Sequence, residues 1–269
     1  IHETFLSQEF AVNFARVVLV YYGVSALLHF VLPSLLSLKR LQPGKQQHGK
    51  DVMRDATRAF IPLIIKAAML QIAQRLHRNG YGVMLNTPLP SMSTLIQDPA
   101  LLLRLLFLWQ LMDMLHDAWF YFSHRLLHTR WLMRNVHYMH HQSSTPNAFS
   151  GYSFHWVEAL AVFHVTLVEI FIFPIPAEMQ VLYELWMVII HVGGHCGFEC
   201  FPFIPHVGML VWFLSGCSKR VKFVLNDVEH HDIHHRSPSH HFSLYFTYLD
   251  YLLGTNHPLF RKDFMMQKG

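Results

Sequence analysis

Long apolar stretches are the feature of this sequence that most restricts its fold. Residues 10–38 form one apolar segment, interrupted only by Asn13, Arg16 and His29, and about 20 apolar residues are enough for a helix to cross a bilayer. Hydrophobic residues make up 52% of the 269 residues and charged residues only 14%, a balance that favours a membrane protein. Further apolar segments lie at residues 59–76, 100–122, 157–173 and 177–192. The sequence therefore predicts an all-α fold, an integral membrane helical bundle with about four spanning helices.

Charge and turn-forming residues predict how these segments are connected. Basic residues at 39–54 follow the first segment, which is typical of a cytoplasmic loop. Residues 77–99 are rich in Pro, Asn, Gly and Ser and predict a loop on the opposite side. The segment at 59–76 contains Lys66 and Gln71, so it either spans with its polar side toward other helices or lies in the membrane interface. The last two apolar segments predict a hairpin that dips into the membrane and returns.

Four short histidine motifs lie beside these apolar segments. Two of them place histidines four residues apart, and the other two follow the pattern HxxHH. Residues three or four apart project from one face of a helix, so imidazoles that converge from two short helices can hold one or two ions of iron, zinc or copper. Ten candidate ligands predict a two-metal site in a histidine-rich helical cap. They are His124, His128, His137, His140, His141, His191, His195, His231, His234 and His235.

Carboxylates next to the motifs are candidates to hold the second nitrogen of a ligand imidazole, which would fix its tautomer. Asp232 lies inside its motif but cannot share the helix face of His231, His234 and His235. We therefore expect it to support the ligands or to cap a helix rather than to bind metal. The candidates are Asp117, Glu158, Glu199, Asp227, Glu229 and Asp232.

The histidine motifs resemble the three boxes of the fatty acid hydroxylase/sterol desaturase superfamily, and the likeness is closest to sterol-oxidising members. The resemblance covers residues 100–257 and also marks His155 and His230, which we expect near the ligands. It is carried by HRLLH at 124–128, HYMHH at 137–141 and HHDIHH at 230–235, and by HWVE at 155–158, HCGFE at 195–199 and YFTYLDYLLGT at 245–255.

The resemblance implies an enzyme that uses two iron ions and O2 to hydroxylate a C–H bond of a sterol, or of a sphingolipid or fatty acyl chain. It implies electrons from NAD(P)H through cytochrome b5 and its reductase, because the chain contains no flavin, haem or Rossmann motif. It also implies the endoplasmic reticulum membrane, with the metal site facing the cytoplasm. Zinc could replace iron in a purified sample. Lys219, Arg220 and Lys222 either receive an acidic partner or form a solvated loop.

The resemblance divides the chain into N-terminal membrane helices at 1–99 and a catalytic region at 100–269. A lipid desaturase would use the same site. A zinc-dependent membrane hydrolase would need Glu158 or Glu199 as a general base, and ten histidines argue against one open zinc site. A catalytically silent scaffold would not need intact histidine boxes.

Two further features narrow the class of protein. Lys and Arg residues flank the apolar runs and form no continuous basic face, so no nucleic-acid partner is expected. The three cysteines, Cys196, Cys200 and Cys217, form no disulfide framework and are expected to be reduced thiols.

Overall fold

The part of the chain that the computed structural model describes is built from helices and contains no strand, which confirms the all-α prediction. The described residues are 8–45, 47–199, 214–216, 227–244, 246–258 and 260. The helices are α1 Gln8–Ala26, the π-helical turn η1 Leu27–Val31, α2 Leu32–Leu35, α3 Gly49–Arg58, α4 Phe60–Arg78, α5 Met92–Gln97, α6 Pro99–Leu127, α7 Arg130–Leu132, the π-helical turn η2 Met133–His137, α8 Tyr138–His141, α9 Trp156–Phe163, α10 Val165–Ile172, α11 Ala177–Gly194, α14 Val228–Arg236 and α15 Tyr248–Leu252. Residues outside the described part include Cys200, Cys217, Lys219, Arg220 and Lys222.

Three helical stretches of the described chain are long and apolar enough to cross a membrane. They are Gln8–Leu35, Gly49–Arg78 and Pro99–Leu127, and they overlap the first three predicted segments. The count of about four spanning helices stays a prediction. On α4, Lys66 and Gln71 are buried against neighbouring helices, so the polar side of this segment faces the bundle.

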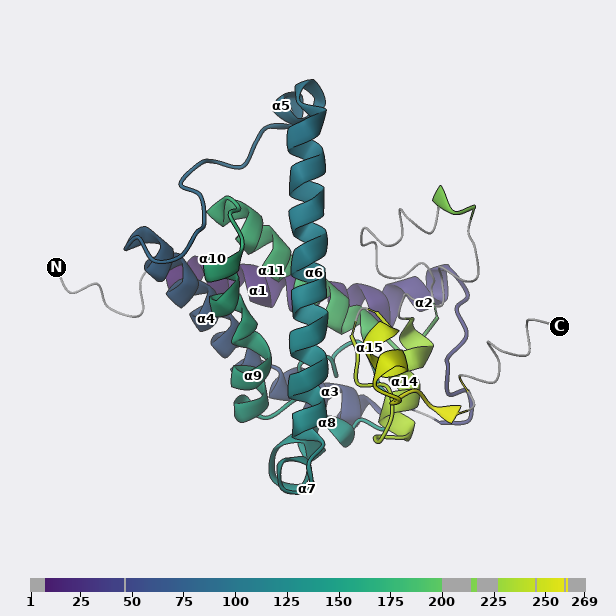
Figure 1. Cartoon of the computed structure of the whole chain (residues 1–269). Helices are drawn as coiled ribbons and strands as arrows, with labels where there is room; N and C mark the ends of the chain where they lie inside the picture. The colour runs from purple at the N-terminus through teal and green to yellow at the C-terminus, as the bar shows by residue number, and fades with distance from the viewer. Residues whose placement is uncertain are drawn as a thin grey trace.

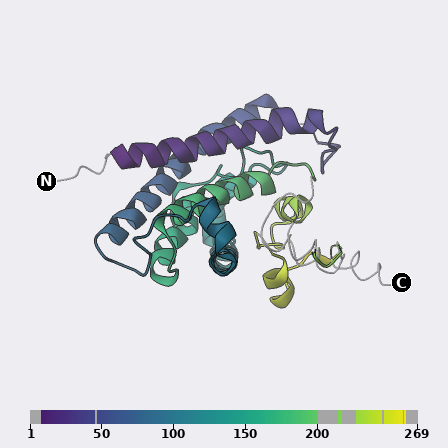
Figure 2. The ribbon, with the colours of Figure 1, turned by 90° about the horizontal axis from the view of Figure 1, so that it is seen from above.

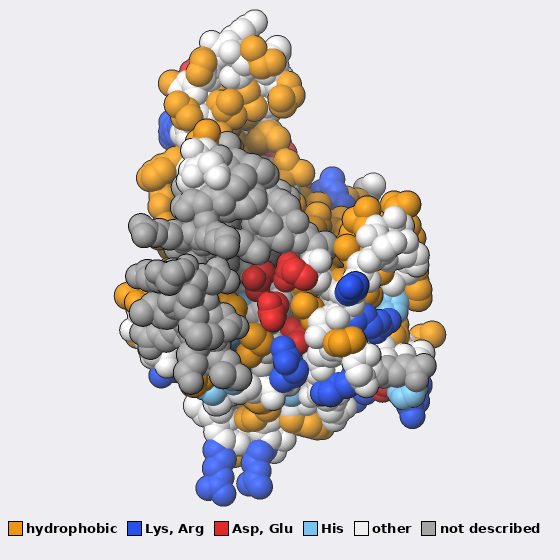
Figure 3. All heavy atoms as spheres, turned by 90° about the vertical axis from the view of Figure 1, so that its right-hand side faces the viewer, with side chains coloured by type: hydrophobic (Ala, Val, Ile, Leu, Met, Phe, Trp, Pro, Cys, Tyr) orange, Lys and Arg blue, Asp and Glu red, His pale blue; other side chains and the backbone are white. Residues whose placement is uncertain are grey.

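The longest helix, α6, begins with a well-formed N-terminus. The Asp98 carboxylate accepts a hydrogen bond of 3.0 Å from the Leu101 N–H, and Pro99 occupies the first turn, where its missing N–H is not needed. The first half of α6 stands apart from the other helices except α5 (Figure 1), and its Leu103 and Phe107 are 66% and 63% exposed. Figure 3 shows apolar side chains over this upper end and Lys and Arg side chains gathered lower down. This distribution is typical of a chain whose upper part lies in lipid.

The other apolar helices pack into a bundle with one continuous core. α1 packs against α4 and α11, and α4 also packs against α9 and α10. In Figure 2, α1 lies along one side of the molecule, and α14 and α15 lie on the other. The predicted hairpin is formed by α9 and α10 followed by α11. The end of α11 brings His195 Nε2 to 3.3 Å from His140 Nε2.

The N-terminal helices hold the loop that follows α8. Tyr21 Oη donates a hydrogen bond of 2.5 Å to the carbonyl of Phe149. The buried carboxylate of Asp55 in α3 accepts hydrogen bonds from Ser143, Asn147 and Ser153 at 2.8–3.0 Å. The division at residue 99 stays a prediction, and in space the two parts share one apolar core.

Candidate metal centre

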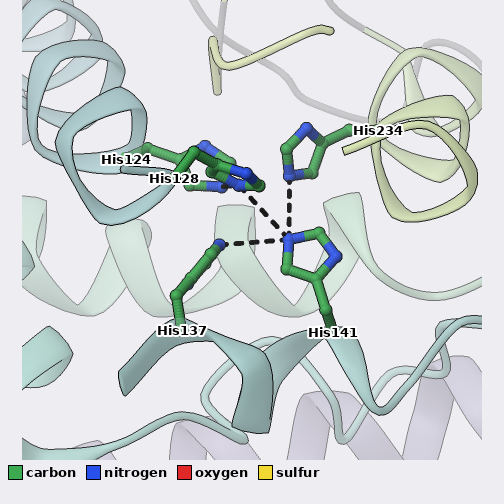
Figure 4. Close-up of side chains that lie close together, drawn as sticks. All are labelled: His124, His128, His137, His141 and His234. Atoms are coloured by element: carbon green, nitrogen blue, oxygen red, sulfur yellow. Dashed lines mark hydrogen bonds between the residues drawn. The ribbon is translucent and has the colours of Figure 1, made fainter. Parts of the chain in front are cut away.

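Nine of the ten candidate ligands gather into two neighbouring groups below the apolar part of the bundle. Within each group, one side-chain nitrogen from every histidine lies within 4.8 Å of the others. Figure 4 shows the first group, with two histidines from the end of α6, two from η2 and α8, and one from α14. The first group is His124, His128, His137, His141 and His234, and the second is His140, His195, His231 and His235.

Local structure explains why these side chains converge. His124 and His128 lie one turn apart at the end of α6, and His137, His140 and His141 follow after a short connection. The wider π-helical turn of η2 ends at His137, at the beginning of α8. A tight sequence of helix, turn and helix therefore presents five imidazoles from one stretch of the chain.

Several imidazoles are fixed by an acceptor on their Nδ1 atom. His124 Nδ1 donates to the Phe242 carbonyl at 3.0 Å, and His234 Nδ1 donates to the His240 carbonyl at 2.6 Å. His195 Nδ1 donates to the His191 carbonyl at 2.7 Å. With its proton on Nδ1, each ring presents the lone pair of Nε2 to the centre of its group.

The Nε2 atoms then approach one another without enough hydrogens to bond them. His141 Nε2 lies 3.1 Å from His137 Nε2, 3.2 Å from His234 Nε2 and 3.3 Å from His128 Nε2 (Figure 4). Even with a proton on its Nε2, His141 could donate to only one of these three nitrogens. A bound cation relieves this repulsion, so the first group fits a metal ion.

The second group has the same character. His231 Nε2 lies 2.8 Å from His195 Nε2, and His140 Nε2 lies 3.3 Å from His195 Nε2. His235 is only 4% exposed, and neither of its ring nitrogens has a hydrogen-bond partner in the described part of the chain. Buried polar atoms rarely stay unpaired, and a metal ligand is a common explanation.

Burial keeps these imidazoles neutral. It lowers the pKa of His137, His140, His234 and His235 well below the ordinary value of 6.5. Burial also lowers the pKa of His141 to about 3, with further lowering by neighbouring His124 and His195. Neutral imidazole is the form that binds metal, so the site is ready for metal ions at neutral pH.

His191 is the predicted ligand that the structure does not bring into either group. Its Nδ1 donates to the carbonyl of Met187 one turn earlier in α11 at 3.1 Å. Its ring packs against Phe120 and Tyr152, with centroids 5.4 Å and 5.2 Å away. His191 and His195 are four residues apart and share one helix face, but only His195, at the end of that face, reaches a histidine group.

Two predicted supporting carboxylates lie next to the ligand groups. Glu158 Oε1 accepts a hydrogen bond of 2.8 Å from His137 Nδ1. Asp117 Oδ1 accepts hydrogen bonds from the backbone N–H groups of Leu244 and Phe246 at 3.3 Å and 3.2 Å. Asp117 thus holds the segment after the third box, while Glu158 holds a ligand directly.

The other predicted supporting residues make different contacts. Asp232 accepts from Gln42 Nε2 at 2.8 Å and pairs with Arg236 Nε at 2.9 Å. His155 caps α9, where its Nδ1 accepts from the Val157 N–H at 3.2 Å. Asp227 accepts a hydrogen bond from the N–H of His230, and Glu199 accepts one from the N–H of Glu229.

Asp250 is an organising residue that the sequence reasoning missed. This buried carboxylate accepts hydrogen bonds from the N–H groups of Phe242 and Ser243 at 2.8 Å and 2.9 Å. It therefore fixes the strip of backbone whose carbonyls orient His124 and His234. His230 is fully buried in the same region and stacks on His241, with ring centroids 3.8 Å apart. The sequence did contain a sign of this role, because Asp250 lies inside YFTYLDYLLGT, one of the stretches that carry the family resemblance.

Comparison with known proteins gives several partial matches. Methylsterol monooxygenase 2-1 of Arabidopsis thaliana is 32% identical over 154 residues, which are 53% of this chain and 53% of that protein. Very-long-chain aldehyde decarbonylase GL1-10 of Oryza sativa subsp. japonica is 29% identical over 241 residues, which are 86% of this chain and 70% of that protein. A cholesterol 25-hydroxylase-like protein of Caenorhabditis briggsae is 33% identical over 140 residues, 51% of this chain and 40% of that protein. No solved structure matches the chain.

A family model gives the broadest assignment. The fatty acid hydroxylase model matches residues 109–255, which is more than half of the chain and includes both histidine groups. The resemblance seen in the histidine motifs is therefore confirmed. This chain belongs to the fatty acid hydroxylase family.

Proposed function

We propose that this protein is a membrane lipid hydroxylase that uses two iron ions and O2 to oxidise a C–H bond of a sterol. Its family and its relatives support the broader statement that it is a lipid-modifying oxidase. The observation that carries the proposal is the pair of adjacent imidazole groups with converging Nε2 atoms. Iron bound there would supply the activation of O2. The protein would orient the ligands and shield the reacting centre from water.

The number of imidazoles in the first group favours iron over zinc for this centre. Structural zinc is almost always bound by four ligands, and catalytic zinc by about three protein ligands with one open position. The first group offers five histidines, which exceeds that number. The second offers four and would suit either metal. Zinc remains a substitute that could occupy the purified protein.

Contacts between the basic segment and the histidine helices support a cytoplasmic centre. Gln42 Nε2 donates to Asp232 Oδ1 at 2.8 Å, and Arg54 donates to Ser143 Oγ at 3.0 Å. The basic segment between α2 and α4 thus lies on the same side as the ligands, and basic loops are retained in the cytoplasm.

We extend the proposal to the endoplasmic reticulum membrane and to electrons from NAD(P)H through cytochrome b5, because the chain carries no redox cofactor motif of its own.

A second candidate reaction is supported by the length of one match. The aldehyde decarbonylase GL1-10 aligns with 86% of this chain, more than the sterol enzyme does. A long-chain aldehyde is therefore the alternative substrate class, and a lipid desaturase would use the same histidine centre. The zinc hydrolase is less well supported, because both candidate general bases already accept hydrogen bonds. Glu158 accepts one from His137, and Glu199 accepts one from a backbone N–H.

The first experiment compares lipids and metal for wild type and His140→Ala. We expect cells that express the wild type to accumulate a hydroxylated sterol, and the purified protein to hold about two iron ions per chain. His140→Ala should lose the product and part of the metal, because it removes a ligand from the second group. His77→Ala is the matched control, since His77 lies at the far end of α4.

Each outcome of this experiment has a definite meaning. Product in His140→Ala equal to wild type would overturn the site. A shortened hydrocarbon in place of a hydroxylated sterol would select the aldehyde reaction. Unchanged lipids with zinc retained in protein supplied with iron and reductant would favour the hydrolase or scaffold.

A further inference from the structure

A second set of buried ionisable side chains lies inside the apolar part of the bundle, away from the histidine groups. Four helices contribute to it: α4, α6, α10 and α11. All members are at most 4% exposed. We call this set the bundle cluster, and its members are Lys66, Asp113, His116, Glu169 and Glu184.

The side chains of the bundle cluster contact one another directly. His116 Nε2 forms a hydrogen bond with Glu169 Oε1, and Lys66 Nζ forms a salt bridge with Glu184 Oε2. Asp113 lies one turn before His116 on α6 and accepts a hydrogen bond of 3.0 Å from Tyr183 Oη. Ionisable groups inside a membrane-spanning bundle are costly, so their presence requires a specific role.

The charges of the bundle cluster do not balance without a further cation. It contains three carboxylates against one ammonium group and one imidazole. Even with His116 protonated, the carboxylates exceed the cations by one. With His116 neutral, one divalent cation balances three carboxylates and Lys66. Uncompensated charge is strongly disfavoured in an apolar interior, so either a bound proton or a bound metal ion must neutralise the excess negative charge.

Unpaired acceptor oxygens favour the metal ion. Glu184 uses Oε2 for Lys66, but its Oε1 is buried with no hydrogen-bond partner in the described part of the chain. The same holds for Asp113 Oδ2 and Gln180 Oε1. Thr166 lies close to Glu184, yet its hydroxyl makes no hydrogen bond of normal geometry. A site with surplus acceptors and few donors is suited to a cation.

The ligand geometry is already present. His116, Glu169 and Glu184 each offer one ligand atom, and these three atoms lie within 4.8 Å of one another. From these contacts we propose that the bundle cluster binds one divalent transition metal ion through His116, Glu169 and Glu184. One imidazole with carboxylates suits zinc, manganese or iron(II), whereas calcium and magnesium prefer oxygen ligands alone.

This site is separate from the histidine centre. His116 precedes His124 by eight residues on α6, which corresponds to about 12 Å along a helix. Glu184 precedes His195 by eleven residues, or about 16 Å along α11. One ion cannot serve both places. The bundle ion ties α6 to α10 and α11, and it stabilises the two helices that carry His124 and His195.

The test counts metal ions in the purified full-length chain after removal of metal and reloading with Co2+. We expect wild type to bind about one ion more per chain than Glu184→Gln, with the visible absorption of the remaining ions unchanged. Glu178→Gln is the matched control, because Glu178 is exposed on the same helix, and it should bind as many ions as wild type. The difference between variants does not depend on how many ions the histidine centre holds.

Other results would overturn the proposal. Equal Co2+ content in wild type and folded Glu184→Gln would show that a protonated carboxyl group balances the charge instead. If Glu184→Gln aggregates, Glu169→Gln takes its place. If both aggregate, His116→Gln is compared with wild type in the same way, and an equal ion count rejects the bundle site.

Discussion

The hydrogen-bond acceptor on the second ring nitrogen fixes the orientation of a ligand histidine, and the candidate ligands have different acceptors. His124, His195 and His234 donate to backbone carbonyls, whereas His137 donates to the carboxylate of Glu158. A carboxylate also makes the imidazole a stronger ligand, because it stabilises positive charge on the ring. His137 therefore depends on a single side chain that can be changed without altering the backbone.

Replacing Glu158 tests this dependence. Glu158→Ala should weaken metal binding by about 10- to 100-fold, the range measured when partners of ligand histidines are removed. Glu158→Gln keeps an acceptor oxygen and should fall between Glu158→Ala and wild type. Competition with a soluble chelator measures the affinity of each variant. Identical affinities for Glu158→Ala and wild type would show that His137 does not need this acceptor.

At the residue scale, the sequence predicted candidates better than it predicted contacts. His124 and His128 belong to the same group, whereas His231 and His234 belong to different groups. Spacing alone did not show which histidines of a motif would lie together. It could not separate His191 from His195, because a shared face does not reveal how far along the helix its neighbours extend. Asp250 was missed for a related reason. Its role depends on hydrogen bonds to a backbone segment that only tertiary folding brings beside α6.

At the element scale, the loop between α8 and α9 fits closely against α11. A Cβ atom on Gly151 would lie 2.8 Å from the His191 carbonyl oxygen and 3.0 Å from its carbon. These are backbone atoms, so the overlap cannot be relieved by rotating a side chain. The end of α11, with His195, is therefore held at a distance that only glycine permits.

Gly151→Ala should displace this helix end and disturb the second histidine group. We expect a loss of stability on the order of 1–3 kcal/mol, as for other overpacked positions, with reduced metal content. Gly23→Ala is the control, since no atom lies within 4 Å of its added Cβ in α1. It should leave stability equal or raise it by up to about 1 kcal/mol. Thermal unfolding in detergent compares the two, and equal melting temperatures would refute the close fit.

Composition alone was enough to predict the long helices of α1, α4 and α6, because apolar length is a property of the sequence itself. The short helix α5 was missed within a region predicted as a loop, since six residues carry little periodic signal. Helix packing was also beyond prediction. In the sequence Lys66 only interrupts an apolar segment, whereas in the fold it pairs with Glu184 of α11.

At the scale of the whole molecule, many buried neutral imidazoles make stability depend on pH. The pKa values of His141 and His195 are lowered to about 3 and about 4, and that of His140 is also well below 6.5, mainly by burial. In the unfolded chain these groups take up protons near pH 6.5. Below that pH the unfolded state binds more protons than the folded state, so folding stability falls as the pH decreases.

The expected result is a melting temperature that is highest near neutral pH and falls as the pH is lowered from about 7 toward 4, even for protein stripped of metal. Metal-loaded protein should show a steeper fall, because bound metal also requires neutral imidazoles. Stripped His140→Ala should show a shallower fall than stripped wild type, since one buried imidazole is absent. Thermal unfolding across this pH range measures all three. A melting temperature that stays constant or rises on acidification would mean that these histidines are protonated in the folded protein, and the two groups could not then be neutral metal ligands.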